Sequence, residues 1–281
     1  MKKIIAILFS AITFSFAVSA QSVPSLLINT DAAAVSMGGV SQSLDAETFG
    51  ATVSYGMWAP QTANASLAGL DACYRLNEKL AFGLSGKLFL DKPYDVVGVG
   101  GMVSGTFAPK DIIVGLGASY AITSALSVGA TVHAVSSSIG PEANGMAFCA
   151  DINASYAIGA FNVAVGACNL GTPISYGKDS YALPALAKVS GSWSGFGLTA
   201  GAEVDYLFSG ALMAGVGVEY GLWDKLFVRG GFHYGDSEKA IPTYASLGLG
   251  AKLAGFRLDA SYLLASKTLG NTILVSLGYA F

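Results

Sequence analysis

Five charged side chains in the carboxyl-terminal half have the spacing at which extended strands bring polar groups to one face. Glu203 and Asp205 are two positions apart, Lys225 and Arg229 are four apart, and Glu219 lies between the two pairs. Because side chains alternate between the two faces of a strand, each pair shares a face if these segments are strands. Such a cluster would suit a track for a polar substrate or ion pairs between neighbouring strands, and the ion pairs require no ligand.

The two histidines, His133 and His233, do not indicate catalysis. Neither has a nucleophile or a set of metal ligands at a recognisable spacing. The glycine-rich pieces at 98–101 and 215–217 lack the strand, turn and helix context of a phosphate-binding loop. The sequence therefore predicts no catalytic residue, no metal site and no cofactor, and it favours a protein that is not an enzyme.

The cysteines allow a geometric prediction. Cys149 and Cys168 flank a predicted turn at 158–159. If residue 157 pairs with residue 160, the two cysteines stand directly opposite each other on one face of a hairpin. An oxidising compartment permits a disulfide between them, whereas a register shift of one residue would separate them. A disulfide and a pair of free thiols both remain open, and Cys73 has no partner in either case.

The elements that position these residues are alternating strands. In residues 79–91, Leu80, Phe82 and Leu84 share one face, while Ser85 and Lys87 share the other. The chain is 53% hydrophobic and only 12% charged, with 36 glycines. After residue 20 it contains no apolar run long enough for a helical membrane span. Since only helices and closed barrels satisfy the backbone in lipid, the sequence predicts an all-β transmembrane barrel over residues 47–281.

Short and variable connections alternate along this barrel and give the number of strands. Six short connections, interpreted as periplasmic turns, lie at 76–79, 122–124, 158–159, 194–195, 221–224 and 254–255. Seven variable ones, interpreted as extracellular loops, lie at 59–65, 92–110, 138–144, 169–183, 208–210, 235–242 and 267–270. They predict a fourteen-stranded antiparallel barrel, and an even number is what bacterial barrels require. Residues 97–107 form either an extension of the third strand or part of the second loop.

The two ends of the chain indicate where it resides. Residues 1–20 combine Lys2 and Lys3 with an apolar run and small residues before Gln21, the pattern of a signal peptide cleaved near Ala20. The last strand alternates apolar positions up to Tyr279 and Phe281 and resembles the carboxyl-terminal signal read by the bacterial barrel assembly machinery. We expect a Gram-negative outer membrane, with its lipid as partner. The net charge of −3 argues against nucleic acid.

Several motifs carry a family resemblance. They are Asn29 to Val40 with its Asp-Ala-Ala and Met-Gly-Gly pieces, 107–111, the Asn-Leu-Gly run at 169–171 followed by Tyr176, 181–185 and 228–234. Because these motifs occur in this order, the chain resembles the PorV/PorQ family of Bacteroidota outer-membrane proteins. That family is similar to the FadL class of fourteen-stranded barrels. The resemblance implies a luminal plug over 21–46 that includes Asp31, Met37, Gly38 and Gly39. It also implies an extracellular loop that contains Asn169, Leu170, Gly171 and Tyr176.

Three functions follow from these observations. The resemblance implies an accessory barrel of type IX secretion that binds exported proteins or secretion components. The FadL-like alternative is a channel for uptake of small hydrophobic molecules. A purely structural barrel, with a filled lumen and no cargo, is the third.

Overall fold

The computed structural model describes residues 21–41, 47–58, 64–98, 100–236, 239–265 and 270–281. The predicted signal peptide and residues 42–46 of the predicted plug lie outside these ranges. Within the described residues, no helix is both long and apolar enough to cross a membrane.

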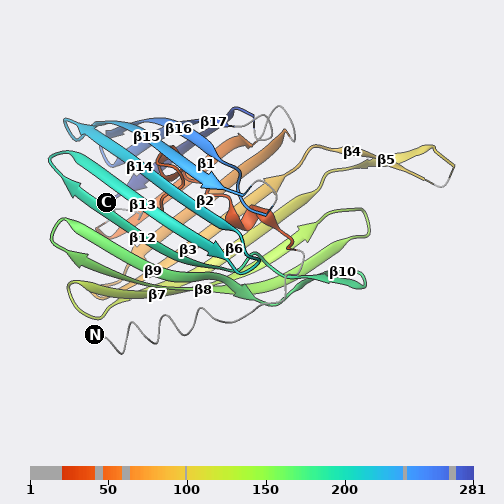
Figure 1. Ribbon diagram of the computed structural model, residues 1–281, viewed down its shortest axis with the longest axis horizontal. Coiled ribbons are helices and arrows are strands. Elements are labelled where there is room, and N and C mark those ends of the chain that lie inside the picture. The colour runs from red at the N-terminus through yellow and green to blue at the C-terminus, as the bar shows by residue number, and fades with distance from the viewer. Residues whose placement is uncertain (1–20, 42–46, 59–63, 99, 237–238, 266–269) are drawn as a thin grey trace.

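The chain forms a closed barrel of fourteen antiparallel strands (Figure 1), which confirms the predicted fold and strand number. Each wall strand pairs with its neighbours in the sequence, and the first and last strands close the barrel. The wall strands are β1 (Phe49–Trp58), β2 (Ala65–Arg75), β3 (Leu80–Leu90), β6 (Lys110–Ala121), β7 (Leu126–Ser138), β8 (Asn144–Ile158), β9 (Phe161–Gly171), β12 (Leu186–Gly195), β13 (Leu198–Leu207), β14 (Leu212–Leu222), β15 (Leu226–Gly235), β16 (Tyr244–Leu253), β17 (Phe256–Ala265) and β18 (Thr272–Ala280).

Tight turns join the wall strands at one end, here called the short-turn end. Between β16 and β17 the turn consists of Ala254 and Gly255, which both have positive φ, 51° and 83°. Two residues with positive φ form the turn whose twist matches that of a hairpin, and glycine accepts this φ without strain. The other end is here called the long-loop end.

Two small hairpins rise from the long-loop end. One contains β4 (Tyr94–Val97) and β5 (Val103–Phe107), and the other contains β10 (Ile174–Tyr176) and β11 (Asp179–Tyr181). The first projects well beyond the barrel rim (Figure 1). Residues 97–107 therefore belong to the second loop and add no strand to the wall, which is why the count stays at fourteen.

The wall alternates between an apolar outer face and a polar or small inner face. On β13, the outward-facing Val204 and Tyr206 are 47% and 46% exposed, whereas the inward-facing Glu203 and Asp205 are 5% and 9% exposed. A barrel in lipid has this distribution. β1 and β18 are also joined at the short-turn end. There a backbone oxygen of Phe281 accepts hydrogen bonds from the N–H groups of Thr48 and Phe49.

Residues 21–41 lie inside the barrel and are here called the luminal segment (Figure 1, red and orange). It contains the 3-10 helix η2 (Pro24–Leu27) and the short helix α2 (Ala32–Ser36). Asp31 caps α2, since its carboxylate accepts hydrogen bonds from the N–H groups of Ala33 and Ala34 at 3.3 and 3.2 Å. This cap satisfies N–H groups that would otherwise be unpaired.

The luminal segment follows the inner wall around the barrel. Ser25 donates to Asp111 on β6 at 2.6 Å, and the Ala32 N–H donates to Ser276 on β18 at 2.8 Å. The Ser41 N–H donates to Glu203 on β13 at 3.2 Å. The segment thus passes the inner faces of β6, β18 and β13 in turn, and it encloses space between itself and the wall.

Candidate functional site

A cavity of about 300 Å³ lies between the luminal segment and the wall. Its lining is divided between apolar side chains near the long-loop end and charged side chains near the middle of the barrel. Pockets for small ligands run from about 300 to 1,000 Å³, so this one suits a small molecule.

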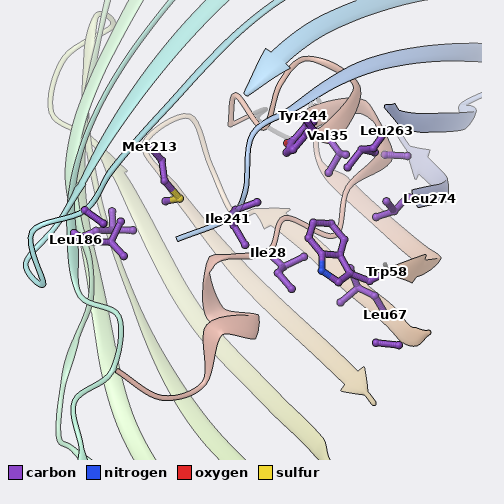
Figure 2. Packing of buried hydrophobic residues seen from close by; sticks show 14 residues of the cluster. Ile28, Val35, Trp58, Leu67, Leu186, Met213, Ile241, Tyr244, Leu263 and Leu274 are labelled. Atoms are coloured by element: carbon purple, nitrogen blue, oxygen red, sulfur yellow. The ribbon is translucent and has the colours of Figure 1, made fainter. Parts of the chain in front are cut away.

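The apolar part of the lining belongs to a buried cluster at the long-loop end (Figure 2). Ile28 comes from the luminal segment, Trp58 from β1, Met213 from β14, Ile241 from the loop before β16, and Tyr244 from β16 itself. All five are less than 10% exposed. Figure 2 shows Ile28, Ile241 and Trp58 gathered between the walls, so the lumen is closed on this side by packed apolar groups.

The polar part of the lining contains a charged group on β12 and β13. Lys188 Nζ lies 2.8 Å from Glu203 Oε1 and 4.0 Å from Asp205 Oδ1. Lys188 also donates to Ser41 Oγ at 3.1 Å, so the pair holds the end of the luminal segment. Lys188 and Asp205 are directly paired across the two strands. Further hydrogen bonds help to offset the cost of removing a partly buried ion pair from water, and the two contacts with Ser41 supply them here.

A second polar group lies on β7 and β8, which β9 alone separates from β12. His133 Nε2 is 3.0 Å from Asp151 Oδ2, and Asp151 Oδ1 accepts the Asn169 N–H at 2.7 Å. Lys87 on β3 donates to the backbone carbonyls of Ser25 and Ile28, the first at 3.0 Å. Two lysines therefore hold the luminal segment, Lys87 on β3 near its start and Lys188 on β12 at its end.

The five charged residues predicted as one cluster are divided by the structure. Glu203 and Asp205 line the cavity, whereas Glu219 and Arg229 belong to a separate network near the short-turn end. Lys225 lies in the exposed turn between β14 and β15, because β14 continues to Leu222 and β15 begins only at Leu226. Alternation along a strand gave the correct face for four of the five, but the turn removes Lys225 from the lumen.

The network near the short-turn end joins two arginines to two carboxylates. Arg229 lies 2.6 Å from Glu219 and 2.8 Å from Asp259, and its side chain is 0% exposed. Arg257 lies 3.0 Å from Glu219 and 2.9 Å from Asp259. The Phe227 ring lies beneath the Arg257 guanidinium at 4.7 Å. Each charge thus has two opposite partners, so the network pairs its own charges, as the simpler interpretation of the sequence supposed.

Sequence reasoning placed Lys87 on the polar face without assigning it a role, and it missed Lys188 and the two partners Arg257 and Asp259. Their signal was present, since alternation places each of them on the inner face of its strand. Pairing across strands was needed to find them: Lys188 faces Asp205 only when the register of β12 and β13 is known.

The predicted plug residues contact the wall through backbone atoms. Met37 is 1% exposed, and Gly38 and Gly39 have positive φ, 74° and 84°. The Gly38 N–H donates to Ser246 Oγ at 3.3 Å, and its carbonyl lies 3.2 Å from His233 Nδ1. Glycines of the wall let this stretch approach closely: a Cβ on Gly217 would stand 2.6 Å from the Met37 carbonyl carbon.

The predicted extracellular loop is corrected for three of its four residues, and Tyr176 stays in the connection between β9 and β12. Asn169, Leu170 and Gly171 belong to β9, and Tyr176 lies on β10 with its hydroxyl donating to Ser137 at 2.7 Å. The cause is a bulge, in which Cys168 and Asn169 together face Asp151. Asn169 takes a positive φ of 58° and donates from its side chain to the Pro184 carbonyl at 3.0 Å. The strand therefore continues where the sequence pattern appeared to end.

The predicted opposition of Cys149 and Cys168 is also wrong. The turn between β8 and β9 pairs Ile158 with Phe161, one residue later than expected at each side, and the bulge adds a further shift. Cys149 consequently faces Gly171, and all three cysteines are free thiols. Among the described residues, no group of three or more His, Cys, Asp or Glu side chains is placed to hold a metal ion.

Comparison with solved structures supports the fold. No family model matches the chain, and no curated protein sequence does either. The Ralstonia pickettii toluene transporter TbuX matches with a TM-score of 0.68 at 14% identity, covering 92% of this chain and 100% of the transporter. The monoaromatic hydrocarbon channel CymD matches at 0.63 and 13%, covering 91% and 98%. A Pseudomonas aeruginosa FadL homologue matches at 0.56 and 12%, covering 95% and 99%. The chain therefore has the fourteen-stranded barrel fold of FadL-like outer-membrane transporters.

Proposed function

We propose that this barrel passes small hydrophobic molecules across the outer membrane of a Gram-negative cell, with its short-turn end towards the periplasm. The observation that carries the proposal is the cavity between the luminal segment and the wall, closed at the long-loop end by the apolar cluster. An apolar solute can enter such a cluster by replacing one set of apolar contacts with another, whereas a polar solute loses its hydration there.

The solved structures support the same function. TbuX and TodX are toluene transporters by name, and CymD is a monoaromatic hydrocarbon channel. All three also match over nearly their whole length, so the present chain has a barrel of the same extent as these proteins. The small cavity volume favours solutes of the size of a single aromatic ring over long acyl chains.

Uptake of radiolabelled toluene by a Gram-negative host expressing the barrel tests the proposal. Expression should raise the rate of uptake above that of the empty vector. Met213→Trp should lower it, because Met213 is 3% exposed and lines the cavity. The matched control is Leu212→Trp on the same strand, which faces outward at 45% exposure and should leave uptake unchanged. Equal uptake with and without the barrel would refute the proposal.

Binding of exported proteins or type IX secretion components, as in the PorV/PorQ family, is the second candidate. The hairpin of β4 and β5 favours it, because the hairpin projects from the barrel and exposes Val97, Met102 and Val103 at 58%, 79% and 59%. Exposed apolar groups of this kind mark interaction sites. Replacing these three residues with serine should abolish copurification of a secreted protein with the tagged barrel, while Ser104→Ala on the same hairpin should not. Absence of any secreted partner from the parent barrel would remove this candidate.

A further inference from the structure

A second cavity continues the first towards the short-turn end. It has a volume of about 390 Å³ and lies on the inner faces of β2, β3, β6 and β7. Asp71 and Ser85 line both cavities, so the two spaces meet at these side chains. Together they run from the apolar cluster to the level of Arg75, the last residue of β2.

The luminal segment leaves this side of the barrel uncovered. Helix α2 packs against β15, β16, β17 and β18, where the inward-facing Ser261 and Ser276 are 3% and 1% exposed. On the opposite side, the inner face becomes more exposed towards the short-turn end: Gly115 is buried, Gly117 is half-buried and Ser119 is exposed. The lumen is therefore filled on one side and open to solvent from the short-turn end on the other.

The two cavities meet beside Gly115. A Cβ at Gly115 would stand 2.5 Å from His133 Nδ1 and equally close to Ser85 Oγ, so both polar atoms border the space left by the absent side chain. His133 Nδ1 is buried and has no hydrogen-bond partner among the described residues. Because Nε2 donates to the Asp151 carboxylate, Nδ1 of the neutral ring is an acceptor, and a solute hydroxyl that donates to it would satisfy this buried atom.

We propose that solutes leave the barrel along this polar wall, past Ser85, His133 and Gly115, and emerge at the short-turn end beside Arg75. The path suits small molecules that combine an apolar part with at least one hydrogen-bonding group. It rests on the proposed uptake function for its solute, but the openness of the path is a property of the barrel alone.

A lateral exit through the wall is the competing route. The outer face of β6 to β9 has an apolar depression that includes Val114, Phe148 and Leu170 and lies over the bulge between β8 and β9. Behind it, β7 and β8 stay paired throughout, including His133 with Cys149. Asp151 and Asn169 are hydrogen-bonded to each other within the bulge. His133 lines both this depression and the luminal cavity, so only the paired strands β7 and β8 separate the two spaces. The axial cavity instead leads to exposed side chains at the short-turn end.

Thiol accessibility tests the path without any transport. In a background with all three cysteines replaced by alanine, Ser85→Cys and Ser276→Cys place one thiol on each side of the lumen. A charged methanethiosulfonate added to the detergent-solubilised barrel should modify the residue-85 variant at least about tenfold faster, because modification at 276 requires local opening of the luminal segment. Equal rates, or faster reaction at 276, would overturn the path.

Uptake measurements test whether solutes use the path. Gly83 lines it and Gly86 faces outward on the same strand, and a Cβ at either position meets no atom closer than 3.7 Å. With p-cresol as the probe, Gly83→Phe should abolish most of the uptake above the empty-vector rate, and Gly86→Phe should not. Full uptake by Gly83→Phe together with a loss in Leu170→Trp would establish the lateral route instead. If the parent barrel shows no uptake of toluene or p-cresol, the uptake function fails, and the thiol rates alone decide whether the path exists.

Discussion

Replacing Gly231 with alanine should release the middle of the luminal segment from the wall. Gly231 and Gly217 are directly paired on β15 and β14, and the peptide between Met37 and Gly38 lies over both. A Cβ at residue 231 would stand 2.8 Å from Met37 Cα and would overlap the Gly38 nitrogen. Both neighbours are backbone atoms, so the contact is relieved only if the segment moves away.

Moving the segment breaks three hydrogen bonds. They join Gly38 N–H to Ser246 at 3.3 Å, Ser246 to the Ser36 carbonyl at 3.0 Å, and His233 to the Gly38 carbonyl at 3.2 Å. At about 1 kcal/mol each, the docked state loses about 3 kcal/mol. The ratio of docked to undocked segment then falls by on the order of a hundredfold.

Single-channel conductance in planar bilayers measures this change. Gly231→Ala should show larger or more frequent openings than the parent barrel. Gly230→Ala is the matched control, since Gly230 faces the other way and a Cβ there meets nothing closer than 4.0 Å. A change in gel mobility when the sample is heated verifies that both variants form folded barrels. If Gly231→Ala forms a barrel and conducts like its control, the close packing of this stretch against the wall is not what holds it.

Four other outcomes follow from the structure. Arg229→Met should lower the free energy of unfolding in urea by about 3 kcal/mol, because it leaves the buried Asp259 and the half-buried Glu219 with only Arg257; an unchanged midpoint would contradict this. Deleting residues 21–41 should raise planar-bilayer conductance above that of the parent, and unchanged conductance would place the segment elsewhere. Phe281→Ser should reduce the amount of barrel inserted in the outer membrane, through loss of the ring contact with Phe49 at 5.7 Å; normal insertion would remove the role assigned to this residue. Electrophoretic mobility should be the same with and without reductant, since Cys149 faces Gly171; a shift would indicate a disulfide.

Features that depend on local chemistry were predictable from the sequence. Alternation placed Glu203 and Asp205 on the inner face, and Gly255 marked the turn between β16 and β17. The strand number followed from such turns and needed no knowledge of pairing.

Features that depend on register were not predictable. The pairing of Ile158 with Phe161 and the bulge at Asn169 together decide what faces Cys149, and a sequence shows neither. The cavity is even harder to predict from the sequence. It is formed by the route of residues 21–41 through the lumen, which is fixed by contacts with residues as distant as Ser276.

That route has a consequence for the order of assembly. The luminal segment contacts β6, β13, β16 and β18, and it precedes all of them in the chain. Once β1 and β18 have paired, the wall is continuous, and the segment can then enter only through an end of the barrel. Its contacts with Ser246 and Ser276 form most directly if the last strands close around a segment already in place. The luminal segment would then act as a template on which the sheet curls, so its loss should slow barrel closure as well as open the lumen.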